Sequence, residues 1–165
     1  MSGTLRADAQ RNLDRVLQAA RECFAENGID ASVDEIARRA GVGHGTVFRH
    51  FPTKEALIAA VIDATVRELT EVAETGAGEH GGFERFIRTA AAAYAENHAV
   101  VAAMDKCRHS PQIEALAAAA EKLVRKAQLR GEVRRDVKVD DVLALIPAAS
   151  RVPDVILDGL RPPAS

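Results

Sequence analysis

A short stretch of the sequence carries side chains whose types and spacing indicate contact with nucleic acid. It contains a glycine, a hydroxyl group, an aromatic ring and two cations in close succession: Gly45, Thr46, Phe48, Arg49 and Lys54. The guanidinium of Arg49 can donate two hydrogen bonds to one guanine, and Thr46 can contact a base edge or a thymine methyl group. Gly45 lets the backbone approach a partner closely, and Lys54 can bind a phosphate without reading sequence. These residues predict a surface that fits a groove of double-stranded DNA.

Two short helices are needed to position this surface. The first begins at Ser32, whose side chain can form a capping box with Glu35. A glycine turn at residues 41–43 separates it from a second helix over residues 44–51. Two helices joined by a three-residue glycine turn are the pattern of a helix-turn-helix.

The second helix is expected to have an inner and an outer side. When Val47 points inward and each residue turns the helix by about 100°, Phe51 falls beside Val47 and Arg49 falls almost opposite. His50 lies about 60° from the inward direction, so we expect it at the edge of the core with its tip on a phosphate. Ser32 fits two roles, a cap alone or a cap that also contacts phosphate.

The remaining pattern is helical as well, so the fold class is predicted to be all-α. Apolar residues recur at helical spacing, and no run alternates like a half-buried strand. A glycine-rich loop is expected at residues 75–82. Helices are expected over residues 13–27, 32–40, 44–51, 53–69, 83–108, 111–131, 139–149 and 153–160.

The net charge hides a local excess of cations. The 165 residues include 22 Lys and Arg against 24 Asp and Glu, a formal net charge of −2, which alone argues against a polybasic nucleic-acid binder. No acidic residue, however, occurs between Ile36 and Lys54, where Arg38, Arg39 and Arg49 lie. Arg38 and Arg39 fit either a solvated helix end or phosphate contacts.

The sequence predicts a cytoplasmic protein with no membrane partner. No apolar run is long enough to span a membrane, and the N-terminus lacks the apolar core of a secretory signal. Only two cysteines occur, Cys23 and Cys107, which favours reduced thiols over a disulfide framework. We expect Cys23 to pack in the core.

Catalytic and metal chemistry are not indicated, so neither an enzyme nor a cofactor is predicted. The glycine-rich loop lacks the Lys-Ser/Thr pair of a phosphate-binding loop. Cys107 and His109, with His98 nearby, offer thiolate and imidazole groups of the kind that bind zinc or copper. Without a second spaced pair of ligands, we expect helix or pocket residues there rather than a metal site.

The stretch from Leu13 to Val61 strongly resembles the DNA-binding domain of TetR-family transcriptional repressors. The resemblance rests on AARECFAENGIDASVDEIARRAGVGHGTVFRHFPTKEALIAAV, with its glycine turn, its GTVFRHF helix and the PTKEAL entry to a fourth helix. Family contact positions fall on Gly43, His44, Gly45, Thr46, Phe48, Arg49, His50 and Lys54. Three positions depart from the family pattern. Gly43 replaces a serine and Phe48 a tyrosine, and each of these two changes removes a hydroxyl contact to phosphate. His44 replaces a lysine, and its imidazole carries a positive charge only when protonated.

The resemblance also implies the organisation of the whole chain. It implies a DNA-binding domain over residues 1–56 and a helical domain over residues 57–165 that binds a ligand and forms a homodimer through its last two helices. The segment AQLRGEVRRDVKVDDVLALI is similar to the C-terminal region of one subgroup of the family. The region over residues 147–159 is short for the family, so the dimer helices are expected to be abbreviated.

An apolar pocket with a few polar side chains is expected in the second domain. Its candidate residues are Phe86, Tyr94, His98, Met104, Cys107 and Arg108. The apolar members of this set also fit a simple packed core.

The functional hypothesis is a ligand-responsive repressor. It would bind a palindromic operator in double-stranded DNA as a homodimer and be released by a small-molecule effector. Two alternatives belong to the same class, a regulator without an effector and an activator. The alternative from another class is an all-helical small-molecule-binding protein or enzyme.

Overall fold

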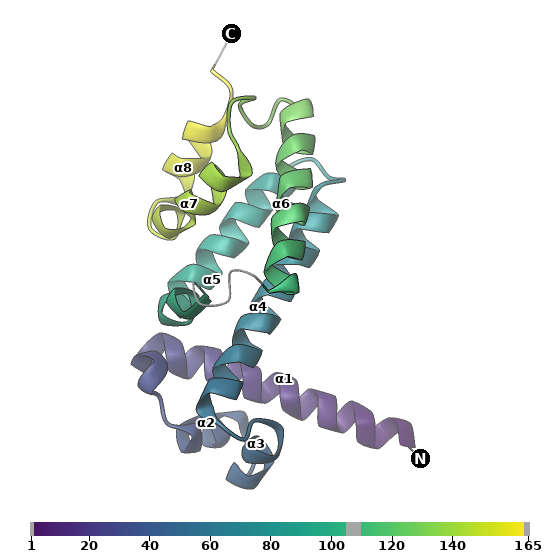
Figure 1. Cartoon of the computed structure of the whole chain (residues 1–165), viewed down its shortest axis with the longest axis vertical. Helices are drawn as coiled ribbons and strands as arrows, with labels where there is room; N and C mark the ends of the chain where they lie inside the picture. Colours follow the sequence, from purple (N-terminus) through teal and green to yellow (C-terminus); the bar gives the residue numbers. More distant parts are fainter. Residues whose placement is uncertain (1, 105–109, 164–165) are drawn as a thin grey trace. The chain divides into compact units, whose positions relative to one another are not determined.

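The chain is all-helical throughout the part that the structure describes. The computed structural model describes residues 2–104 and 110–163, and the side chains of residues 8–96 and 110–163. The elements are α1 (Ser2–Asn27), the 3-10 helix η1 (Gly28–Asp30), α2 (Val33–Ala40), α3 (His44–His50), α4 (Lys54–Gly76), α5 (Gly82–Met104), α6 (Pro111–Leu129), α7 (Val139–Ala149) and α8 (Pro153–Leu160) (Figure 1). The predicted fold class is confirmed.

The helices belong to two compact units. The first contains residues 2–64 and 96–104, and the second contains residues 65–95 and the described residues from 110 onward. No described helix is both long and apolar enough to cross a membrane.

The core of the first unit is built from the apolar faces of α1 and α2. Val16, Ala20 and Phe24 recur at helical spacing on α1 and are buried, as is Ile36 on α2. Cys23 is fully buried on the same side of α1, as predicted. Helix α1 packs on α2, and α2 packs on α3, which brings the short helices into one body (Figure 1).

Caps and a glycine turn fix the ends of α2. The Ser32 hydroxyl accepts a hydrogen bond from the Asp34 N–H at 3.2 Å, so Ser32 caps the helix as predicted. The predicted capping box is not formed with Glu35, because the Glu35 carboxylate lies 3.5 Å from the Arg39 guanidinium instead. Gly41 ends the helix with φ at +64°, a backbone conformation that glycine adopts without steric cost.

The loop predicted over residues 75–82 is shorter than expected. Helix α4 continues to Gly76 and α5 begins at Gly82. A Cβ atom added at Gly82 would lie 2.1 Å from the Gly76 carbonyl oxygen, so the two backbones touch at this point. The glycines therefore permit close contact between the two helix ends, in addition to forming a turn.

The later helices of the second unit lie where the sequence predicts them. Ser110 caps α6 by accepting from the Ile113 N–H, and the chain leaves α6 at Gly131. Helices α7 and α8 match their predicted ranges and pack on each other, with Pro147 inside α7.

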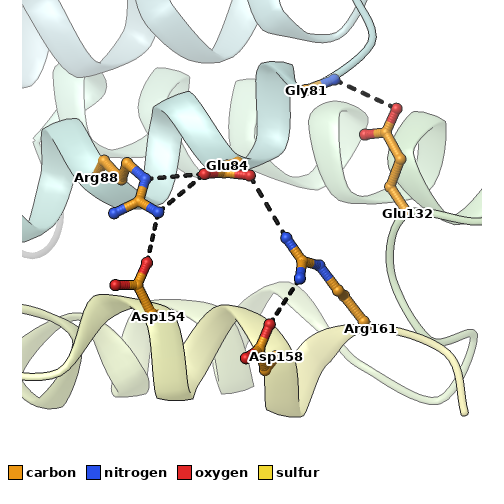
Figure 2. A network of polar contacts seen from close by, with 7 residues as sticks. All are labelled: Gly81, Glu84, Arg88, Glu132, Asp154, Asp158 and Arg161. Atoms are coloured by element: carbon orange, nitrogen blue, oxygen red, sulfur yellow. Dashed lines mark hydrogen bonds and ion pairs between the residues drawn. The ribbon is translucent and has the colours of Figure 1, made fainter.

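Ion pairs join α8 to α5 in the second unit. Arg88 donates hydrogen bonds to Glu84 at 2.9 Å and to Asp154 at 2.6 Å (Figure 2). Arg161 contacts Asp158 at 2.6 Å and Glu84 at 3.7 Å, which links the other end of α8 to the same carboxylate. Because all of these groups are substantially exposed, the network orients α8 more than it stabilises the fold.

Candidate nucleic-acid interface

Helix α3 has the inner and outer sides that its sequence predicts. Val47 is 0% exposed and Phe51 is 9% exposed, so both anchor the helix in the core of the first unit. On the opposite side, Gly45 and Arg49 are exposed. Phe48, on a flank, is 42% exposed, which is unusual for an aromatic ring. The outer side therefore offers a flat backbone, a cation and an apolar ring to a partner.

The two central cations of this surface are not engaged within the protein. Neither the Arg49 side chain nor the Lys54 side chain makes a hydrogen bond or ion pair with another described residue. Thr53 caps α4 by accepting from the Ala56 N–H at 3.1 Å, which fixes the turn that carries Lys54. Both cations can therefore contact an anion without breaking an internal bond.

His44 is held by two neighbours at the start of α3. Its Nδ1 atom contacts the Asp34 carboxylate on α2. Its ring stacks on Phe48, with the ring centroids 4.5 Å apart and an angle of 29° between the planes. Sequence analysis missed Asp34, because nothing in its own neighbourhood of the sequence marks it; the contact arises only when the turn brings the start of α2 beside the start of α3.

Gly43 and Ser32 lie at the N-terminal ends of α3 and α2 and are exposed, whereas Thr46 is half-buried. His50 was predicted at the edge of the core, and this position is wrong. Its side chain is exposed, and its ring is tilted by 50° to the Phe51 ring with the ring centroids 6.3 Å apart.

The cations between Ile36 and Lys54 are partly neutralised by acidic side chains that lie outside this segment. The two terminal nitrogens of Arg39 donate hydrogen bonds to the two carboxylate oxygens of Glu26 on α1, each at 2.7 Å. These bonds lower the pKa of Glu26 and raise that of Arg39. Arg39 is therefore a clamp between α1 and α2, a role that sequence analysis did not assign. Arg38 is exposed and 3.8 Å from Glu35. Arg38, Arg49 and Lys54 remain as the accessible cations of the segment.

The predicted ligand-binding residues are only partly covered by the structure. Phe86 is buried and Tyr94 is half-buried on α5. The side chains of His98 and Met104 lie outside the described set, as do the residues Cys107 and Arg108. The group of possible metal ligands, Cys107 and His109 with His98, therefore also lies outside it. Among the described residues, no group of three or more His, Cys, Asp and Glu side chains could hold a metal ion.

A cavity of about 430 Å³ is present in the second unit. It lies between the start of α5, the turn after α6 and the end of α8, and its lining includes Phe83, Glu84, Arg130, Leu157 and Arg161. Neither of the two predicted ligand-binding residues whose side chains the structure describes, Phe86 and Tyr94, lines it. The sequence pattern therefore did not indicate this cavity.

An exposed helix face with free cations, supported by a second helix across a glycine turn, defines a helix-turn-helix DNA-binding protein. Comparisons with known proteins agree. Residues 16–61 match the model of bacterial regulatory proteins of the tetR family, and residues 79–162 match the C-terminal domain of SbtR-like transcriptional regulators.

Individual relatives extend this match over most of the chain. The transcriptional regulator UidR of Escherichia coli K12 is 31% identical over 150 residues, which cover 83% of this chain and 76% of UidR. A transcriptional repressor of Mycobacterium tuberculosis is 50% identical over 58 residues, 34% of this chain and 31% of that protein. The crystal structure of a TetR regulatory protein from Mycobacterium vanbaalenii is 41% identical, with a TM-score of 0.77 and coverage of 96% of this chain and 99% of that chain.

The chain belongs to the TetR family. It is a DNA-binding transcriptional regulator and not an enzyme.

Proposed function

We propose that this regulator is a repressor that binds a palindromic operator as a homodimer and is released by a small-molecule effector. The observation that carries the proposal is the outer side of α3, where Arg49 is exposed and unengaged within the described structure while Val47 is fully buried. Residues 1–56 would supply DNA binding, and residues 57–165 would supply the dimer and the effector site.

In this proposal α3 lies in the major groove. Arg49 reads a guanine through its O6 and N7 atoms, and Thr46 contacts a neighbouring base edge. Gly45 allows close approach, and Phe48 packs against a sugar or a thymine methyl group. Contacts to phosphate fix the register without reading sequence; they are assigned to Ser32, Gly43, His44, His50 and Lys54.

Repression is favoured by one relative. The Mycobacterium tuberculosis protein that is 50% identical to this chain over 58 residues is named a repressor. A repressor acts by occupying its operator, so it needs only DNA binding and release.

The homodimer is supported by an apolar surface on the last two helices. Val152 and Val155 are 46% and 67% exposed, an unusual exposure for large apolar side chains. Gly159 lies four residues beyond Val155, and a Cβ atom there would meet no other atom within 4 Å, so a second helix can approach closely. Ala144 and Ala148 on α7 are exposed as well. A second copy of this chain, seated on α7 and α8, would cover this surface.

A charge placed on this surface tests the dimer. Val155→Asp should shift the protein from dimer to monomer in sedimentation velocity. Leu129→Asp is the matched control, because Leu129 is also a highly exposed apolar residue but lies at the end of α6. A Val155→Asp variant that remains dimeric would overturn this interface.

Effector control requires a site in the second domain. The cavity beside α5, α6 and α8 is within the size range of small-molecule sites. An effector shifts the protein away from the DNA-binding conformation only if it binds the two conformations with different affinity, and operator DNA must then weaken effector binding by the same factor. Titration of the DNA complex with a small-molecule library should identify compounds that release DNA.

A gel-shift titration tests the proposal as a whole. The DNA upstream of the protein's own gene should be bound in preference to a random duplex of equal length, with an affinity that falls steeply as salt is raised. Equal affinity for both duplexes would contradict operator recognition.

A further inference from the structure

The residue His44 differs from the other candidate phosphate contacts because its ring is already engaged inside the protein. Nδ1 contacts a carboxylate oxygen of Asp34, and the face of the ring stacks on Phe48. The two contacts come from different helices, α2 and α3, and together they restrict both the position and the plane of the ring. Nε2 is the nitrogen left for a partner outside the protein.

The contact with Asp34 determines where the ring carries its hydrogen. An ionised carboxylate only accepts hydrogen bonds, so Nδ1 must carry the hydrogen in this contact. In a neutral imidazole the other nitrogen, Nε2, is then a bare acceptor. A DNA phosphate oxygen is also only an acceptor. The neutral ring therefore cannot donate to phosphate while it donates to Asp34.

We propose that Asp34 is a positioning residue that holds His44 for a phosphate contact through Nε2, and that each bound subunit takes up one proton from solvent at this atom. The imidazolium donates from both nitrogens, to Asp34 and to phosphate, and its charge offsets the repulsion between the carboxylate and the DNA backbone. The inference rests on the proposed docking of α3 in the major groove.

Besides Asp34 and His44, the charged or titratable side chains of α2 and α3 are Glu35, Arg38, Arg39, Arg49 and His50, and Lys54 follows at the first position of α4. Glu35 is paired with the two arginines of α2, at 3.5 and 3.8 Å, and His50 contacts Phe51. Among the described residues, Asp34 is the charged group that contacts the His44 ring. Imidazole gains its proton in the range in which DNA binding is ordinarily measured.

The test is the pH dependence of DNA binding by the full-length protein and its variants. Fluorescence anisotropy with a labelled random-sequence duplex at low salt measures backbone contacts without knowledge of the operator. Between about pH 8 and about pH 6, wild-type affinity should rise by up to about tenfold per pH unit for each subunit bound, the limit for uptake of one proton. His44→Lys, which is always charged, should lose that share of the pH dependence and still bind.

Two further variants separate positioning from general electrostatics. In Asp34→Asn the amide can donate to Nδ1, so Nε2 carries the hydrogen in the neutral ring; affinity at about pH 8 should rise and the pH dependence should shrink. Glu35→Gln removes the neighbouring carboxylate, which contacts arginines rather than His44, and should keep the wild-type pH dependence. His50 is present in every variant and cancels from the comparison.

The outcomes distinguish this inference from the function on which it rests. Equal pH dependence in the wild type and His44→Lys would overturn the proton uptake at His44. An equal decrease in the pH dependence of DNA binding in Asp34→Asn and Glu35→Gln would overturn the positioning role of Asp34. Absence of DNA binding by all variants at every pH would overturn the docking of α3, and this inference with it.

Discussion

Replacement of Arg49 by alanine should separate DNA recognition from folding. The side chain is exposed and makes no hydrogen bond or ion pair within the described ranges, so its removal should change folding stability by no more than about 0.5 kcal/mol. Loss of a bidentate contact to guanine costs about 1–3 kcal/mol per half-site. Over two half-sites this is about 2–6 kcal/mol, or a loss of operator affinity between about 30-fold and about 10⁴-fold.

The assay is a titration of operator DNA and of a random duplex at one fixed salt concentration, with thermal melting as the folding control. Arg49→Ala should lose operator affinity far more than random-duplex affinity, and its preference at one base pair of each half-site should relax. Lys54→Ala is the matched control, because a phosphate contact should be lost on both duplexes alike. Equal losses for Arg49→Ala on the two duplexes would refute base reading by this residue.

The packing of the first unit leads to three more predictions. Burial shields the Cys23 thiol from solvent and raises its pKa. In a Cys107→Ser variant Cys23 is the one cysteine left, and it should react with a chromogenic disulfide reagent only after unfolding. Rapid labelling of the native variant would contradict this. The hydrogen bond from Arg39 lowers the pKa of Glu26 in the folded state, so its stabilisation is complete above the unfolded value of about 4.3 and is lost as pH falls through the lower folded value. Glu26→Gln should therefore lower the melting temperature at neutral pH, by an amount that shrinks in acid; a constant difference down to about pH 3 would be inconsistent with this pair. Gly41→Ala places a side chain at φ +64° and should destabilise the protein by about 1–2 kcal/mol in chemical denaturation, whereas unchanged stability would show that the turn relaxes.

The outer side of α3 could be predicted because it depends on local geometry. The rotation of about 100° per residue places Arg49 opposite Val47 in any regular helix, whatever surrounds it. The last two helices were predicted for the same reason, since apolar residues at helical spacing are a local signal. Pro147 is accommodated inside α7 without ending it.

The contacts that tune the surface depend on tertiary structure and were not predictable. Asp34 and Glu26 reach His44 and Arg39 from positions ten and thirteen residues away, across turns whose geometry the sequence pattern does not specify. His50 was placed at the core edge by rotation alone, but the short helix ends there and leaves its side chain exposed.

The prediction of a ligand pocket meets the same limit. An aromatic residue at helical spacing has the same pattern whether it fills a core or lines a cavity, and Phe86 is buried. The cavity in the second unit combines the start of α5 and the end of α8 with the turn after α6. Arg130 and Glu132 of that turn come from a segment that the sequence matched only to a family subgroup. The predicted set around Tyr94 stays a prediction.

Methylation interference on bound operator DNA reports which groove α3 enters. Methylation of guanine N7, in the major groove, should block binding at two symmetric half-sites separated by about one helical turn or a multiple of it. Interference confined to adenine N3 in the minor groove, or a single asymmetric site, would contradict the placement of α3 in the major groove of a palindromic operator.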